Sequence, residues 1–437
     1  MSIIQNPTLG EKIKLLREAA GFSQAKLAKA LYSSTMLISR IERDLAACDD
    51  EMLHTIKKTL GVENAPLLES ELTAYKSRLV ALFDMIEGDN LIAAQASMDT
   101  LFAITDLPWE YDLSIMYSSL KTMLEVLAKT VTARQALGAD EFITIGADNY
   151  LDNASSKEAL YMYHLTKGLI YYYKSDDVNA IEHLTKLFDN PNNYFTPDAK
   201  ILTFIGTCYI FLLKPVKAML WLERARAIYN YSRASRVGPL MNQMLGLCYI
   251  TTGEYKLAKE LHETGLAQAR SVNDEIRIAE ELINLAVVSE GMGDLEKSVR
   301  LSDQALSHIN KDQTPVHYLS AITNKAKFLY RLKKHEKARE LLDYGKTLSY
   351  IDSSLAILLE ALSHLLTLKN SESIDYLENV AIPHFRTSIS YIHMALDICR
   401  LLEDHYKRTR SAKKALLMAS TIRDIYEDMF IGESNYV

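Results

Sequence analysis

Five residues between positions 35 and 43 carry side chains suited to contacts with nucleic acid. The guanidinium of Arg40 is able to donate two hydrogen bonds to O6 and N7 of a guanine, with a phosphate contact as its alternative role. Hydroxyls bond base edges or phosphates, and a thioether contacts the methyl group of thymine or packs on the sugar. The candidate DNA-binding residues by this criterion are Thr35, Met36, Ser39, Arg40 and Arg43.

The charge around these residues differs from that of the whole chain. The 437-residue chain has a formal net charge of −7, so bulk attraction does not bind it to nucleic acid. Residues 9–43 nevertheless hold seven Lys or Arg and three acidic residues, a local charge of +4. We therefore expect any DNA contact to be confined to this part of the chain.

The residues that flank the candidates predict four short helices. A capping box of Thr8 and Glu11 starts the first helix, and Ser23 caps the second. The third helix is expected over Thr35–Arg43, after a three-residue turn of the kind that a helix-turn-helix requires. The fourth runs from about residue 50 to residue 60.

Two short motifs in this region carry a family resemblance. Ser23-Gln24-x-x-Leu27-Ala28 and Ile38-Ser39-Arg40-Ile41-Glu42 resemble the helix-turn-helix of the Xre, Cro and lambda-repressor class over residues 9–61. The resemblance implies that Gln24 binds a phosphate, that the third helix reads bases, and that Arg17 pairs with Glu42. Tyr32 and Asp44 stand where the family usually has Gly, so we expect the turn after the third helix to differ.

Beyond residue 66 a pattern aligned on Gly/Ala-x-x-Tyr recurs about every 40 residues, and its first three clear copies keep the aromatic residue as Tyr171, Tyr209 and Tyr249. Its small residue lies at positions 168, 206, 246, 286 and 326, with an Ala or Ser twelve residues later, and weaker copies lie near 82 and 361. The pattern resembles tetratricopeptide repeats, in which pairs of antiparallel helices stack into a superhelix with a concave surface.

Helical spacing of apolar residues and the scarcity of Gly and Pro extend over almost the whole chain. The expected fold is all-α: an N-terminal lambda-repressor-like helix-turn-helix followed by a right-handed tetratricopeptide-repeat superhelix. We expect a head over residues 1–66, a linker or start of the repeats over 67–75, and a sensing and dimerisation domain over 76–437.

The repeat register predicts which side chains face the groove. Asn284 and Asn324 occupy equivalent positions, where an amide can bond the main chain of an extended peptide or, alternatively, the adjacent repeat. Lys327 and Arg331 lie one turn apart and could hold a carboxylate. The candidate peptide-binding residues are Thr203, Gln243, Glu280, Asn284, Asn324, Lys327 and Arg331.

The head and the repeats together resemble the RRNPP family of peptide-pheromone receptors, and most closely its neutral-protease-regulator-like members from Bacillus and Paenibacillus. The resemblance implies a quorum-sensing transcription regulator that binds a palindromic operator on double-stranded DNA, senses a short signalling peptide and dimerises through its repeats. Two alternatives stay open: a phage arbitrium-type receptor that controls lysogeny, and a scaffold that sequesters a sporulation response regulator.

The sequence contains no recognisable catalytic or metal-binding motif. Its four cysteines are widely spaced, and it has no phosphate-binding Gly loop, Gly-x-Ser-x-Gly or His-Glu-x-x-His motif. We therefore expect no catalytic residue, no metal, no cofactor and no enzymatic activity. No signal pattern or long apolar run occurs, so the protein is expected in the cytoplasm without membrane contact.

Overall fold

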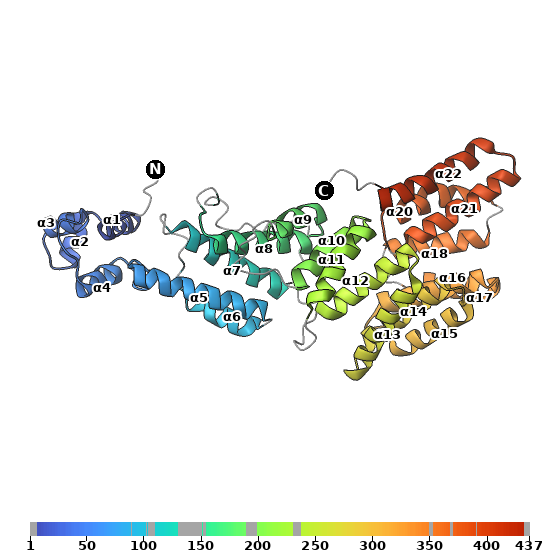
Figure 1. Cartoon of the computed structure of the whole chain (residues 1–437), viewed down its shortest axis with the longest axis horizontal. Coiled ribbons are helices and arrows are strands. Elements are labelled where there is room, and N and C mark those ends of the chain that lie inside the picture. The colour runs from blue at the N-terminus through green and yellow to red at the C-terminus, as the bar shows by residue number, and fades with distance from the viewer. Residues whose placement is uncertain are drawn as a thin grey trace. The chain divides into compact units, whose positions relative to one another are not determined.

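The computed structural model (Figure 1) describes residues 7–88, 90–101, 103, 110–129, 151, 154–188, 199–229, 237–348, 353–367, 370–389 and 391–431. Within these ranges every regular element is a helix, which confirms the all-α class. The chain forms two compact units, residues 1–196 and 197–437.

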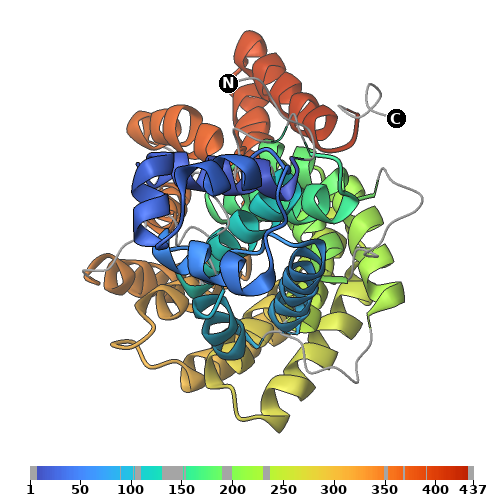
Figure 2. The ribbon, with the colours of Figure 1, turned by 90° about the vertical axis from the view of Figure 1, so that its left-hand side faces the viewer.

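Four short helices form the head at the start of the first unit (Figure 2). Thr8 and Glu11 make the predicted capping box, and Ser23 accepts from the backbone N–H of Lys26. Each of the four helices buries an apolar side chain, namely Ile13, Leu27, Ile38 and Ile56. The helices are α1 (Leu9–Ala19), α2 (Gln24–Ala30), α3 (Thr35–Ile41) and α4 (Asp50–Thr59).

The two turn residues that replace glycine keep the backbone conformation that glycine favours. Tyr32 has φ 52° and Asp44 has φ 57°, both in the left-handed region. The Asp44 carboxylate accepts hydrogen bonds from the backbone N–H of Gly10, at 3.0 Å, and from the hydroxyl of Thr8. The turn after α3 is therefore bonded to the start of α1 through the side chain of Asp44, while its backbone keeps the left-handed conformation.

Five longer helices complete the first unit. The weak copy near residue 82 falls in the first of them, and the stronger copy at Gly168 falls in the pair formed by the last two. These helices are α5 (Glu69–Glu87), α6 (Leu91–Asp99), α7 (Tyr111–Lys129), α8 (Lys157–Tyr173) and α9 (Asp177–Thr185).

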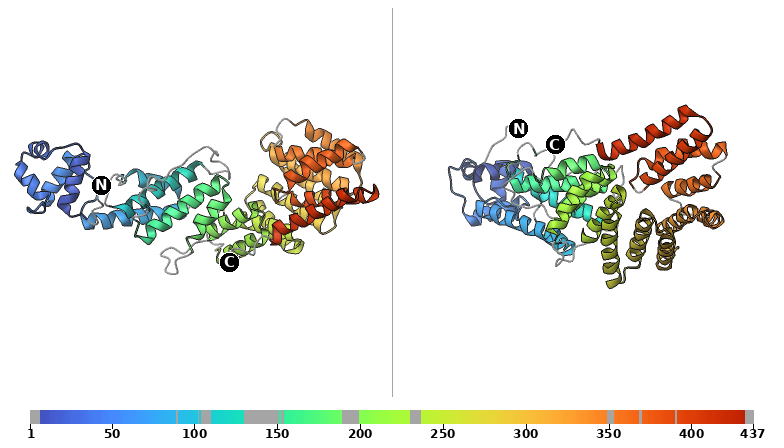
Figure 3. Two further views of the ribbon diagram at one scale, coloured as in Figure 1. Left: turned by 90° about the horizontal axis from the view of Figure 1, so that it is seen from above. Right: turned by 45° about the vertical axis from the view of Figure 1, so that its right-hand side comes forward.

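Antiparallel helix pairs make up the second unit, and Figure 3 shows several of them standing side by side. Each predicted small residue lies in the first helix of a pair, and the Ala or Ser that follows lies in the second, so the repeat prediction is confirmed. The pairs are α10 (Ala199–Phe211) with α11 (Pro215–Ile228), α12 (Val237–Thr252) with α13 (Tyr255–Ser271), α14 (Glu275–Gly291) with α15 (Leu295–His308), α16 (Pro315–Arg331) with α17 (His335–Lys346), α18 (Ser353–Leu366) with α19 (Ser371–Tyr376), and α21 (Ile392–Arg408) with α22 (Ala412–Tyr426). Short elements η3 (Leu377–Ala381) and α20 (Ile382–Phe385) precede α21, and η4 (Glu427–Ile431) follows α22.

Small residues let the two helices of a pair approach closely. A Cβ added to Gly206 would lie 2.6 Å from Cγ of Leu222 on the partner helix, which leaves no room for a methyl group. Cys208 and Cys248 are fully buried at equivalent positions, and burial raises the pKa of the Cys248 thiol to about 12. Both cysteines are packing residues.

The turn inside each helix pair shares one backbone feature. The residue seven positions after the small residue has a positive φ in every confirmed copy from 168 to 326, whether or not it is glycine. Arg410, with φ 58°, marks the same turn between α21 and α22, where Tyr406 and Ala415 are buried in the expected repeat positions. This pair escaped the sequence analysis because Glu403 stands where the pattern has a small residue. The turn residues are Ser175, Leu213, Gly253, Gly293, Lys333 and Arg410.

The last element of the second unit returns to its first helix pair. Lys214 Nζ donates to the backbone oxygen of Asp428 in η4 at 2.7 Å. Leu213 packs against the hydrophobic cluster that contains Met429. The two ends of this unit are therefore joined, although more than 200 residues separate them in sequence.

Candidate nucleic-acid interface and repeat-domain cavity

One face of α3 presents the predicted reading residues to solvent. Thr35, Met36 and Arg40 are exposed and Ser39 is half-buried, whereas Ile38 on the opposite face is buried in the head core. A short helix that packs with one side and exposes polar and thioether groups on the other has the form of a recognition helix.

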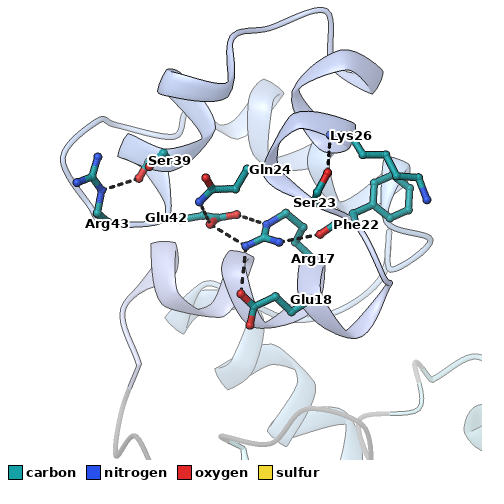
Figure 4. A network of polar contacts seen from close by, with 9 residues as sticks. All are labelled: Arg17, Glu18, Phe22, Ser23, Gln24, Lys26, Ser39, Glu42 and Arg43. Atoms are coloured by element: carbon teal, nitrogen blue, oxygen red, sulfur yellow. Dashed lines mark hydrogen bonds and ion pairs between the residues drawn. The ribbon is translucent and has the colours of Figure 1, made fainter.

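Local hydrogen bonds orient the two arginines near this face. Arg40 Nη2 donates to the backbone oxygen of Leu45 at 3.0 Å. Arg43 Nε donates to the backbone oxygen of Ser39 at 3.0 Å, as Figure 4 shows. A guanidinium has five N–H donors, so each arginine keeps donors for a further partner.

A buried network behind α3 contains the predicted Arg17–Glu42 pair (Figure 4). Arg17 Nε lies 2.5 Å from Glu42 Oε1, and its Nη2 lies 3.0 Å from Oε2, which confirms the pair. The hydrogen bond with Glu42 raises the pKa of Arg17 further, against the opposing effect of burial. Arg17 also donates to the backbone oxygen of Phe22 at 2.7 Å, so the network joins α1, the following turn and α3.

Gln24 belongs to the same network. Its Nε2 donates to Glu42 Oε2 at 2.7 Å, so Glu42 receives hydrogen bonds from two elements. The amide has two N–H donors, and the second is the one left for a phosphate oxygen.

The positive charge of residues 9–43 is only partly available at the surface. Lys12 and Arg17 are buried and bonded to other parts of the first unit. Lys26 is exposed, with its Nζ 4.0 Å from the centre of the Phe22 ring. The exposed cations of this stretch are Lys14, Lys26, Lys29, Arg40 and Arg43.

A cavity of about 430 Å³ lies among the helix pairs of the second unit. Four of the predicted peptide-binding residues line it, namely Asn284, Asn324, Lys327 and Arg331. Apolar side chains of Leu247, Ile283 and Val287 supply part of its wall. Mixed apolar and hydrogen-bonding walls of this kind are typical of ligand pockets.

Three other predicted residues do not line this cavity. Thr203 is fully buried, and its hydroxyl donates to the backbone oxygen of Ala199 at 2.7 Å, so it is a packing residue. Ten of the 13 residues of α10 are buried, so the register position that is expected to face the groove is covered here. Gln243 is half-buried, and Glu280 is 2.9 Å from Nε2 of His317.

Lys327 and Arg331 already share a carboxylate. Glu290 lies 2.7 Å from Lys327 and 2.8 Å from Arg331, and its own side chain is 8% exposed. Burial favours a raised pKa, but the two cations outweigh it and hold the pKa of Glu290 below its usual value. The carboxylate that the two cations hold in this structure is thus one of the chain's own, and the trio carries one net positive charge.

The α21 helix contributes residues to the cavity that the sequence analysis missed. Arg400 bonds Asp397 at 3.3 Å and the hydroxyl of Tyr426 at 2.8 Å. His393 also lines the cavity, and burial lowers its pKa. The spacing of Tyr406 and Ala415 was the available signal for this repeat.

Both predicted groove asparagines line the cavity. Asn324 Nδ2 donates to the backbone oxygen of Ser320 at 3.0 Å, within its own helix rather than to the adjacent repeat. Its carbonyl oxygen and second N–H remain for another partner. Asn284 lines the cavity one repeat earlier.

Within the described part of the chain, no three His, Cys, Asp or Glu side chains gather in a way that could hold a metal ion. None of the described helices combines the length and apolarity that crossing a bilayer requires.

Comparison with known proteins agrees with both parts of the fold. A helix-turn-helix family model matches residues 13–63. A Rap protein complexed with competence and sporulation factor has a similar fold, with a TM-score of 0.58 and 14% identity over 82% of this chain and 98% of that chain. No curated protein matches the sequence.

The quorum sensor NprR also has a similar fold. Its apo form from B. thuringiensis has a TM-score of 0.58 and 16% identity over 81% of this chain and 98% of that chain. NprR in complex with its cognate peptide NprX has a TM-score of 0.55 and 17% identity over 81% of this chain and 99% of that chain. The predicted architecture of a helix-turn-helix followed by helical repeats is thus confirmed at the level of fold.

Proposed function

We propose that this chain is a cytoplasmic transcription regulator of the RRNPP type, in which a short signalling peptide controls DNA binding by the head. One combination carries the proposal: a helix-turn-helix with an open reading face is joined to repeats that hold a cavity with polar and apolar walls. The fold that it shares with NprR, solved with its cognate peptide, supports a peptide as the ligand. Regulation then comes from binding rather than catalysis.

On DNA, Arg40, Thr35, Met36 and Ser39 would contact base edges, while Gln24 and Arg43 would anchor phosphates. A homodimer formed through the repeats would place two heads on the half-sites of a palindromic operator, about 34 Å apart. The exposed cations around α3 supply the attraction for phosphate.

In the repeats, Asn284 and Asn324 would bond the main chain of an extended peptide. The single net positive charge of Lys327, Arg331 and Glu290 would accept one carboxylate of the ligand. The apolar wall would receive its neighbouring side chain.

A second candidate is a scaffold that sequesters a response regulator, with DNA binding secondary. The TM-score to the Rap structure, equal to that for apo NprR, favours keeping it. Complex formation with a response regulator that survives Arg40→Ala would support this candidate. An arbitrium-type receptor would use the same parts, and would differ in the operator that it selects.

The DNA-binding test selects sequences from a random duplex library with the full chain, and then measures affinity against salt concentration. Arg40→Ala should lower the affinity for the selected site by roughly 5- to 150-fold. This corresponds to the loss of about 1–3 kcal/mol expected for a bidentate guanine contact. Arg300→Ala, an exposed arginine outside the head, is the matched control. Binding that ignores both salt and Arg40→Ala would refute the proposal.

The peptide test captures peptides from spent culture medium on the full chain and titrates a synthetic copy by calorimetry. Asn284→Ala and Asn324→Ala should each lower affinity about 2- to 10-fold, as loss of a net hydrogen bond of roughly 0.5–1.5 kcal/mol predicts. Gln268→Ala, exposed on α13, should leave affinity unchanged. Equal affinity in all four proteins would exclude this cavity as the peptide site.

A further inference from the structure

Two lysines of the head point inward rather than toward solvent. Lys12 on α1 is 9% exposed and Lys57 on α4 is 6% exposed. Lysine is almost never buried to this degree unless it is paired, because removing an ammonium from water is costly. Their near neighbours Lys14 and Lys58 are exposed, so burial is specific to the two positions.

Both lysines converge on the segment that leads from the head into α5. Lys12 Nζ donates to the backbone oxygen of Leu67 at 3.2 Å and lies 3.5 Å from Glu110 Oε1, just before α7. Lys57 Nζ lies 2.9 Å from Glu71 Oε1 in the first turn of α5.

Glu71 connects Lys57 to the same point of the backbone. Its Oε2 accepts from the N–H groups of Leu67, at 2.8 Å, and Leu68, at 3.0 Å. Burial would raise the pKa of Glu71, but these N–H groups and Lys57 outweigh it and hold the pKa below its usual value. The carboxylate is thus ionised when it bonds Lys57.

The backbone at Leu67 is consequently held from two helices of the head. Its oxygen is bonded to α1 through Lys12, and its N–H is bonded to α4 through Glu71 and Lys57. Ala65, Pro66 and Leu67 are themselves buried. A segment held in this way is no flexible tether, and Glu110 extends the contact to α7.

The reading face takes no part in these bonds. Thr35, Met36 and Arg40 are exposed on α3, while Lys12 and Lys57 project from α1 and α4 toward the first repeat. The contact therefore fixes the direction of the head without covering the residues proposed to meet DNA.

We propose that Lys12, Lys57, Glu71 and Glu110 are positioning residues that lock the head to α5 and α7, so that these parts move as one rigid body. A displacement of the first repeat is then carried directly to the DNA-reading face. The rigid attachment stands apart from the proposed function, and only its consequence for DNA rests on that function.

The attachment is tested by measuring spin-label distances in the full chain. Nitroxides are placed at Lys29→Cys on α2 and Lys121→Cys on α7, both exposed, in a Cys48→Ser background because the other cysteines are buried. The starting protein and the matched variant K14M/K58M should give one narrow distance distribution. In K12M/K57M the distribution should be at least twice as wide. In K12M/K57R its width should lie between those of K12M/K57M and the starting protein.

Equal widths in all the variants would overturn the proposal. Circular dichroism checks that each variant keeps its helix content, so that a broad distribution reports motion rather than unfolding.

A DNA measurement then tests the consequence of the attachment. With the operator selected above, K12M/K57M should bind an isolated half-site within about twofold of the starting protein. It should bind the two-half-site duplex about tenfold more weakly, because a loose head lowers the effective concentration of the second contact. Equal losses on both duplexes would reject positioning. Failure of the starting protein to bind DNA would refute the proposed function and leave the spin-label result standing.

Discussion

At the scale of single residues, the Arg17–Glu42 pair should dominate the stability of the head. Glu42→Ala leaves the buried Arg17 guanidinium without its carboxylate, and we expect it to cost about 3–5 kcal/mol. Replacing both residues with Met should cost much less, since no uncompensated charge remains. Hydrogen exchange of α1–α3 in the full chain measures the difference.

Glu18 provides the control for this prediction. Its carboxylate also contacts Arg17, at 3.2 Å, but is half exposed. Glu18→Ala should change the opening free energy by no more than about 1 kcal/mol, as for other exposed pairs. If Glu18→Ala and Glu42→Ala were equally damaging, burial would not be the cause.

His317 should titrate above its usual pKa because of Glu280. The hydrogen bond between them, 2.9 Å long, raises the pKa of His317 more than burial lowers it. The bridge therefore stabilises the α14–α16 contact below the unfolded-state pKa of about 6.5, and that stability is lost as pH rises through the raised value.

Nuclear magnetic resonance titration of the histidine Cε1–H signals tests this. The His317 midpoint should fall in Glu280→Gln and stay unchanged in Glu275→Gln, whose partner is His308. A midpoint that ignores Glu280→Gln would contradict the assignment.

At the scale of elements, the left-handed turn residue should control the stability of each helix pair. Gly253 has φ 84° with no atom within 4 Å of an added Cβ, so Gly253→Ala tests backbone strain alone. We expect a loss of about 1–2 kcal/mol. Lys333 is exposed with φ 60°, so glycine can replace a larger residue at this turn. Lys333→Gly should raise the free energy of unfolding by up to about 1 kcal/mol. Chemical unfolding measures both, and changes of the same sign would count against strain as the cause.

Local patterns predicted local structure well. The cap residues Thr8 and Ser23 predicted where their helices start, because a cap acts on residues next to it in sequence. The 40-residue spacing predicted the helix pairs, because the two helices of a pair follow each other along the chain. The contacts of Lys12 and Glu290 could not be predicted, because each finds its partners in distant parts of the chain, up to 98 residues away for Lys12. The prediction that Thr203 faces the groove was wrong for the same reason. The repeat register predicts the side of the helix on which a side chain lies, but the packing of neighbouring helices decides whether that side is covered.

At the scale of the whole molecule, closure of the second unit links its last element to its first. Met429 in η4 is 1% exposed in the cluster that also receives Leu213. Met429→Ala should cost about 2–5 kcal/mol and increase hydrogen exchange in the α10–α11 turn, although that turn is distant in sequence. Phe430→Ala, at a partly exposed neighbour, should have little effect on the hydrogen exchange of this turn. If the α10–α11 turn kept its protection from hydrogen exchange in both variants, the two ends of the second unit would be independent of each other.

The positive φ that recurs in the helix-pair turns also bears on how such proteins diverge. The position accepts Gly, Ser, Leu, Lys and Arg, so its requirement is on backbone shape and leaves almost no trace in residue identity. Repeats built on such a requirement are free to change most of their residues while the architecture persists. This chain and NprR share their fold at only 16–17% identity. It also indicates that distant relatives are better sought by turn spacing than by residue matching.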